Sequence, residues 1–264
     1  MSSWTAVSAN LHANSCFQRR QGFDFASKQH VVGVFLEELT QLIPHYACAF
    51  IKDEAGSYKF VALVGLGGER NLFVNFEHQW LCNYVPAALR AYPFTLLDKP
   101  DGNPNEKILC IDTDYLTNES GATRLFDGEG NLGPEAAGVL DFLDNCDRGR
   151  VQTQTACAAL DDANVITPWE LSISKAEDQE PLKVADLYRI DEIALCKLDS
   201  SIVTGLLNCG AFALAYAQLF SMHQIHKLDK NLNYLSQQEP RRNSQSSVAG
   251  IFAEDEGSLN FDGF

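Results

Sequence analysis

The longest uncharged run in the sequence extends from Ser200 to Met222 and constrains the fold more than any other stretch. Apolar residues recur in it at helical spacing, and Asp199 or Ser200 can cap its N-terminus. The opposite side is only weakly polar, which is typical of a helix that is buried on most sides or lies in a membrane. Because Asn208 and Gln218 interrupt the run, we expect a buried helix and no membrane insertion.

The rest of the pattern predicts an α+β fold. Alternating segments at 46–52 and 58–64 are joined by a turn, and a second such pair lies at 169–174 and 182–189. A helical pattern at 134–163 separates the two hairpins, with a break near Gly149 left open. We therefore expect a mainly antiparallel sheet of hairpins packed on a buried C-terminal helix, with helical segments between.

The domain organisation follows from where the apolar periodicity ends. At 264 residues the chain is long enough for one large domain, which we expect over residues 1–235. From residue 236 onward Ser, Gln, Gly and acidic residues dominate, and the periodicity is lost. This composition predicts a disordered acidic C-terminal tail over residues 236–264.

Charge and cysteine usage restrict the partners and the compartment. The formal net charge of −15 argues against nucleic acid, because phosphate binding needs clustered Lys and Arg, and against an anionic membrane surface. The eight cysteines form no CxxC motif and lie mostly in apolar runs, as expected in a reducing compartment. With no signal peptide visible at the N-terminus, we expect a cytoplasmic protein.

Known cofactor motifs are not matched. Residues 61–68 imitate the start of a dinucleotide fingerprint, but a strand is expected at 71–75 where the fingerprint needs a helix. Phosphate-loop and hydrolase-elbow motifs do not occur. His223 and His226 could face one ligand, but cations near a helix C-terminus explain them better. We expect no metal and no cofactor.

The strongest polar constellation lies in two segments, 84–94 and 188–192. Arg189 ends a predicted core strand beside Asp191 and Glu192. It can orient a carboxylate substrate, or it can pair internally with Asp112 or Asp191, the interpretation that we favour. In the internal case Asp191 caps the following helix. The candidate ligand-binding residues are Trp80, Tyr84, Arg90, Tyr92, Asp112, Tyr188, Arg189, Asp191 and Glu192.

Short motifs also occur in a characteristic order along the chain. They are Asn71-Leu-Phe-Val, Trp80 with Tyr84-Val-Pro86, Leu89 to Phe94, Leu109-Cys-Ile-Asp112, Leu125-Phe-Asp127-Gly, Pro168-Trp169, Leu187 to Glu192 and Ala213-Leu-Ala-Tyr-Ala217. In this combination the chain resembles the bacterial SapC family over about residues 10–230.

The resemblance implies a link to surface-layer proteins. Members of the family often lie near genes for TonB-dependent receptors, flavin-dependent halogenase-like proteins and cupin-like proteins, and the resemblance implies no catalytic residue. We therefore expect an accessory or binding protein with a protein or peptide partner, which could be a halogenase-like or receptor-linked protein. The alternative is an enzyme that acts on a peptide or carbohydrate-derived substrate in a pocket between residues 84–94 and 188–192. The oligomeric state stays open.

Overall fold

The first hairpin of the chain forms as its sequence predicts. In the computed structural model, which describes residues 3–67, 70–100, 106–119, 121–173 and 182–253, β4 (Cys48–Lys52) pairs with β5 (Tyr58–Leu63) in antiparallel register. The Asp53 carboxylate accepts hydrogen bonds from the backbone N–H groups of Ala55 and Ser57, at 3.1 and 2.8 Å. Gly56 adopts a positive φ of 82°, which glycine tolerates without strain. Local chemistry therefore closes this turn.

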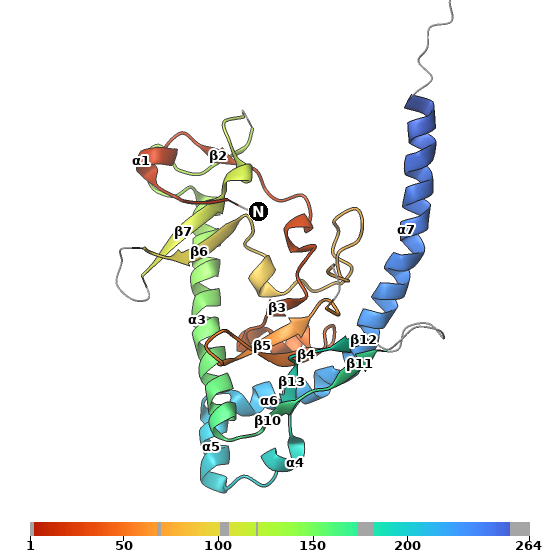
Figure 1. Cartoon of the computed structure of the whole chain (residues 1–264). Helices are drawn as coiled ribbons and strands as arrows, with labels where there is room; N and C mark the ends of the chain where they lie inside the picture. Colours follow the sequence, from red (N-terminus) through yellow and green to blue (C-terminus); the bar gives the residue numbers. More distant parts are fainter. Residues whose placement is uncertain (1–2, 68–69, 101–105, 120, 174–181, 254–264) are drawn as a thin grey trace, which may run out of the picture.

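The hairpin is the centre of a five-stranded antiparallel sheet with the order β10-β13-β4-β5-β3 (Figure 1). Its outer strands are β3 (Val31–Gly33), β10 (Ile166–Pro168) and β13 (Tyr188–Ile190). Three smaller sheets accompany it. One contains β1 (Trp4–Ala6), β7 (Lys107–Asp112) and β6 (Phe94–Asp98), and another contains β8 (Leu116–Thr117), β2 (Cys16–Phe17) and β9 (Thr123–Arg124). The third is the second predicted hairpin, β11 (Leu171–Ile173) with β12 (Leu182–Val184).

Helices cover and connect these sheets. They are α1 (Ala9–His12), α2 (Leu39–Leu42), α3 (Pro134–Asp162), α4 (Glu192–Leu195), α5 (Ser200–Asn208), α6 (Ala211–Ser221) and α7 (Ile225–Ala253). Helix α6 contacts β4 and β13 of the five-stranded sheet. The antiparallel sheets and the C-terminal helix packed against the largest of them confirm the predicted α+β class.

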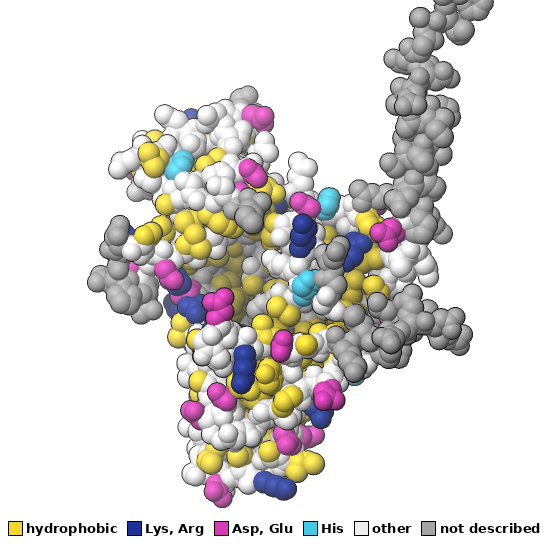
Figure 2. Space-filling model, in the orientation of Figure 1, with side chains coloured by type: hydrophobic (Ala, Val, Ile, Leu, Met, Phe, Trp, Pro, Cys, Tyr) yellow, Lys and Arg dark blue, Asp and Glu magenta, His cyan; other side chains and the backbone are white. Residues whose placement is uncertain are grey.

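Helix α3 joins two hydrophobic cores. The large core contains the five-stranded sheet, α6 and the C-terminal half of α3, including Ala156 and Leu160. The small core contains Phe17, Phe94 and Ile111, with Ala136 near the start of α3. Figure 1 shows α3 running from the β6–β7 hairpin down to α5. Figure 2 shows that the surface is indented between the two parts, with hydrophobic side chains in the indentation.

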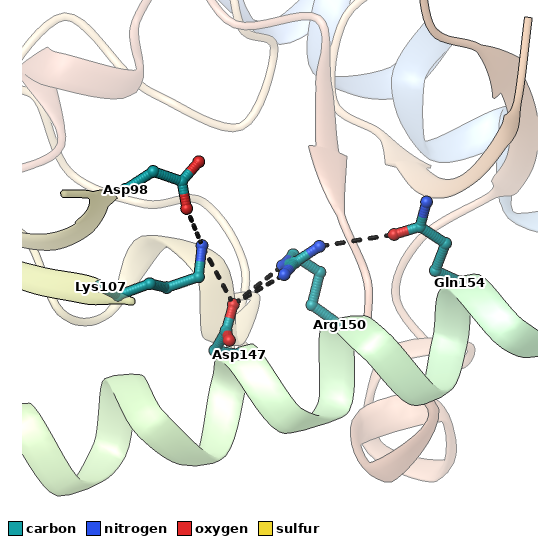
Figure 3. Close-up of polar contacts among 5 residues, drawn as sticks. All are labelled: Asp98, Lys107, Asp147, Arg150 and Gln154. Carbon is teal, nitrogen blue, oxygen red and sulfur yellow. Dashed lines mark hydrogen bonds and ion pairs between the residues drawn. The ribbon is translucent and has the colours of Figure 1, made fainter. Parts of the chain in front are cut away.

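A polar network ties the β6–β7 hairpin to the middle of α3 (Figure 3). The Lys107 ammonium lies 3.0 Å from the Asp98 carboxylate and 3.6 Å from the Asp147 carboxylate. Arg150 donates to Asp147 from one side and to Gln154 from the other, at 2.9 and 3.4 Å. Because these charges form a network and Lys107 is largely covered, they hold the small core in one position along α3 better than an isolated surface pair would.

The single helix expected over Ser200–Met222 is wrong, because the run is broken into α5 and α6. The chain bends by 86° between Ser200–Asn208 and the helical stretch Ala211–Glu239, which begins with α6, and the break contains Gly210, which has a φ of 76°. A Cβ at this position would lie 3.2 Å from the Leu36 side chain. Glycine therefore permits both the left-handed turn and the close approach. In the described part of the chain no single helix is long and apolar enough to cross a membrane, and only this bent pair passes that test together.

Two further expectations need correction, and the open question of a break in α3 is answered. Residues 71–75 form a buried turn instead of a strand, because the side-chain Oδ1 of Asn71 accepts the Phe73 N–H at 2.8 Å and competes with the hydrogen bonds of a strand ladder. Helix α3 does not break at Gly149, which is buried where the Glu37 carboxylate approaches. Residues 236–253, expected to be disordered, continue α7, because a helix once nucleated extends at little cost. The remainder of the expected tail, 254–264, lies outside the described residues.

Candidate functional site

The structure distributes the predicted site residues over separate places. Trp80 donates its indole N–H to the Tyr46 hydroxyl at 2.8 Å, and to the Tyr84 carbonyl at 3.2 Å, against the large core. Tyr92 donates to the buried Asp112 carboxylate at 2.6 Å, and its ring stacks on Phe25. These contacts place Trp80 against the large core and join Tyr92 to Asp112 at the end of β7.

The 188–192 segment lies elsewhere. Tyr188 packs edge-on against Tyr58, with ring centroids 5.1 Å apart, within the five-stranded sheet. The Asp191 carboxylate accepts the Ala194 N–H at 3.0 Å and caps α4, as the sequence predicted, and Glu192 is the first residue of that helix. Neither of the two cavities that Arg90 lines contains a residue of this segment.

Arg189 contradicts the expected internal ion pair. Its side chain is exposed on β13, and within the described residues it forms no ion pair with Asp112, Asp191 or any other carboxylate. The period-two alternation explains the error: Ile190 faces the core, so its neighbour must point outward.

Arg189→Ala is therefore expected to change the free energy of unfolding by no more than about 0.5 kcal/mol, as is usual for surface positions. Urea denaturation followed by circular dichroism measures this change. A decrease of several kcal/mol in the free energy of unfolding would instead support an internal ion pair of Arg189.

Arg90 is the predicted residue around which a cavity forms. It lies between two adjoining cavities that share Arg90 and Phe142, and we name the two together the arginine groove. Cavity A has a volume of about 620 Å³ and is lined by Arg19, Arg20, Arg90, Tyr92, Phe94 and Phe142, among others. Cavity B has a volume of about 490 Å³ and is lined by Glu37, Glu38, Tyr84, Arg90, Cys146 and Arg148, among others.

The arginines of the groove are held mainly by aromatic rings and by uncharged oxygens. The Arg90 guanidinium lies 4.7 Å from the Tyr84 ring centroid and donates to the Val85 carbonyl at 2.8 Å. The Arg20 guanidinium lies 4.0 Å from the Phe23 ring centroid, and burial lowers its pKa. Such cation–π contacts fix a guanidinium without neutralising it. Arg148 donates to Asn145 on α3.

These three guanidinium groups are not neutralised by the protein. Among the described residues, no Asp or Glu forms an ion pair with Arg20, Arg90 or Arg148. By contrast, Arg19 at the edge of cavity A pairs with Glu135 at 2.7 Å. In a sequence with 35 acidic and 20 basic residues, the gathering of unneutralised arginines in one groove is unexpected on composition alone.

Glu38 forms a wall of cavity B. Its side chain is only 6% exposed, and its carboxylate accepts the N–H groups of Phe35 and Ala87, at 3.1 and 2.8 Å. It also accepts the Tyr84 hydroxyl at 2.8 Å. Burial, reinforced by the Glu38 charge, raises the pKa of Tyr84 to about 12, so the phenol remains a donor. Glu38 is therefore engaged in shaping the groove and is not a free base.

Cys146 lies on the floor of cavity B without the properties of a nucleophile. Burial raises the pKa of its thiol to about 11, and the nearby Glu38 carboxylate acts in the same direction. The thiol is therefore almost entirely protonated at neutral pH, whereas the thiolate is the reactive form. The chemistry available in the groove is recognition by charge, aromatic surface and hydrogen bonds.

No group of three His, Cys, Asp or Glu side chains gathers to hold a metal ion in the part of the chain that the structure describes. His223 and His226 stack with ring centroids 6.5 Å apart, and His223 contacts the Phe220 carbonyl at 2.6 Å. His223 therefore lies just after the end of α6, as the helix-end interpretation expects, whereas His226 lies in the first turn of α7, so that interpretation is wrong for His226.

Of the residues that line the groove, sequence reasoning named Tyr84, Arg90 and Tyr92 and missed the others, among them Arg20, Glu38, Phe142 and Arg148. The adjacent arginines at 19 and 20 were a usable signal, because consecutive cations stand out in an acidic chain. Glu38 had no usable signal, because its partner Tyr84 is 46 residues away in the sequence.

A family model described as SapC matches residues 7–228 of the chain, which is most of its length. No curated protein and no solved structure matches.

Proposed function

Because the chain belongs to the SapC family, we propose that it is a cytoplasmic accessory protein that binds a protein partner through the arginine groove. The partner belongs to a surface-layer, TonB-receptor-linked or peptide-modifying system, such as one with a flavin-dependent halogenase-like protein. One observation carries the binding role: Arg20, Arg90 and Arg148 line one open groove without carboxylate partners among the described residues.

The groove has features of a binding surface. It combines aromatic side chains, such as Tyr84, Tyr92 and Phe142, with charged groups that have spare hydrogen-bonding capacity. Aromatic residues and arginine are enriched in protein interfaces. Its ionisable groups are poorly suited to covalent chemistry, because Glu38 is engaged by three donors of the protein and burial raises the pKa of the Cys146 thiol to about 11.

The alternative is an enzyme that acts on a peptide or carbohydrate-derived substrate. We expected its pocket between residues 84–94 and 188–192. The two cavities at Arg90 differ from that pocket, because neither is lined by a residue of 188–192. Turnover of such a substrate by the purified chain, lost in Arg90→Gln, would nevertheless establish it.

A photocrosslinking amino acid introduced at Phe142 tests the binding role in the cells from which the gene comes. We expect position 142 to cross-link to a protein of one of the three systems, and we expect Arg90→Gln to reduce the yield. The matched control is the same amino acid at Ile193, which is 69% exposed on α4, away from the groove. Cross-linking to the same proteins from both positions, or to none from position 142, would contradict the proposal.

A further inference from the structure

We infer that the arginine groove takes an extended acidic peptide segment with aromatic side chains, whose carboxylates bind Arg20, Arg90 and Arg148. The inference rests on the proposed function and adds the chemical class of the ligand. A guanidinium can bind a carboxylate through two parallel hydrogen bonds, so each arginine can bind one acidic side chain of the ligand.

The charges within the groove support an anionic ligand. Three carboxylates also line it: Glu38 is charged but accepts three hydrogen bonds from the protein, and Glu135 pairs with Arg19. Glu37 lies against Gly149, at the cavity B end. The four arginines that line the groove (Arg19, Arg20, Arg90 and Arg148) outnumber its three carboxylates, while the whole chain carries a net charge of −15. A long polyanion such as nucleic acid would meet the acidic surface beyond the groove, whereas a short acidic segment would not.

The dimensions favour a peptide over a single small anion. Along α3, Glu135 lines cavity A and Gln152 lines cavity B. At 1.5 Å per helical residue, these positions are about 25 Å apart along the helix axis. An extended chain rises about 3.3 Å per residue, so about seven or eight residues would follow the groove from end to end.

The aromatic side chains of the groove indicate that its ligand contains aromatic residues as well as acidic ones. Phe142 is shared by both cavities, and Tyr92 and Tyr84 lie on either side of it in cavities A and B. Rings at these positions offer surface on which an aromatic side chain of the ligand can pack edge-on or offset, between one arginine and the next. The ligand therefore alternates acidic with aromatic residues.

Fluorescence anisotropy with a labelled octapeptide of alternating glutamate and phenylalanine tests the inference on the full-length protein. We expect binding that weakens as salt is raised. We expect Arg90→Gln to raise the Kd about ten-fold or more, since a charge-assisted hydrogen bond contributes about 1.5–3 kcal/mol.

The control variant is Arg189→Gln, an exposed arginine outside the groove, which should bind the octapeptide as the wild type does. Equal weakening by Arg189→Gln, equal binding of an octapeptide with lysine in place of glutamate, or full competition by millimolar inorganic phosphate would each overturn the acidic-peptide assignment. If the octapeptide fails while position 142 still cross-links to a partner in cells, the ligand class is wrong and the proposed function stands. If both fail, both are wrong.

Discussion

Ala217→Arg is expected to lower the free energy of unfolding by about 4 kcal/mol or more, enough to leave much of a marginally stable protein unfolded. Ala217 is 5% exposed on α6 and packs in the large core. A guanidinium placed there would lose its hydration and overpack the site. Urea denaturation followed by circular dichroism measures the loss, and a melting temperature gives an independent value.

Ala213→Arg is the matched control, because it makes the same change one helical turn earlier. Ala213 is exposed, so this variant should stay within about 0.5 kcal/mol of the wild type. If both variants unfold alike, α6 is buried on all sides, as its apolar sequence alone would indicate. If neither does, α6 is not packed where the structure places it.

Gln218→Leu is expected to cost about 3 kcal/mol, the second-largest effect. Gln218 is completely buried. Its side-chain oxygen accepts the Ile190 N–H at 3.0 Å, and its side-chain nitrogen donates to the Cys48 carbonyl at 3.3 Å. Leucine keeps a similar volume but leaves two buried backbone groups without partners, each at a cost of about 1–3 kcal/mol.

The position of Gln218 explains why the loss of its side-chain amide has a large effect on stability. β13 pairs directly with β4 only at Tyr188 and Phe50, and the antiparallel register places Ile190 opposite Cys48 two residues further along. At that point the amide of Gln218 bridges the two strands in place of a direct ladder bond. Hydrogen exchange should therefore show faster exchange of the Ile190 amide in Gln218→Leu. The control is Gln237→Leu at an exposed site on α7, and an equal loss of stability there would refute this explanation.

Local features of the fold could be predicted because they depend on neighbouring residues. The turn after β4 closes through Asp53 and Gly56, which lie within the turn itself. Asp191 caps α4 through an N–H only three residues away. The antiparallel hairpins and the α+β class followed from such short-range patterns.

The groove could be predicted only in part. Arg90 and Tyr84 were among the expected residues because aromatic and charged groups are concentrated in their segment. However, Arg20 comes from the N-terminal part of the chain and Arg148 from α3, and no short-range pattern connects these three regions. Arg189 was assigned to the interior because its neighbours are apolar, but strand alternation turns it outward.

The sequence by itself determined where strands, turns and helix caps form, because those preferences arise from backbone geometry and from hydrogen bonds between close neighbours. Tertiary structure decided which side of an apolar helix is buried, and it decided the 86° bend at the break that contains Gly210, where Leu36 approaches from another part of the chain. It also brought Arg20, Arg90 and Arg148 to one groove. These outcomes depend on contacts between residues far apart in sequence, whose energies exist only once the two cores are packed along α3.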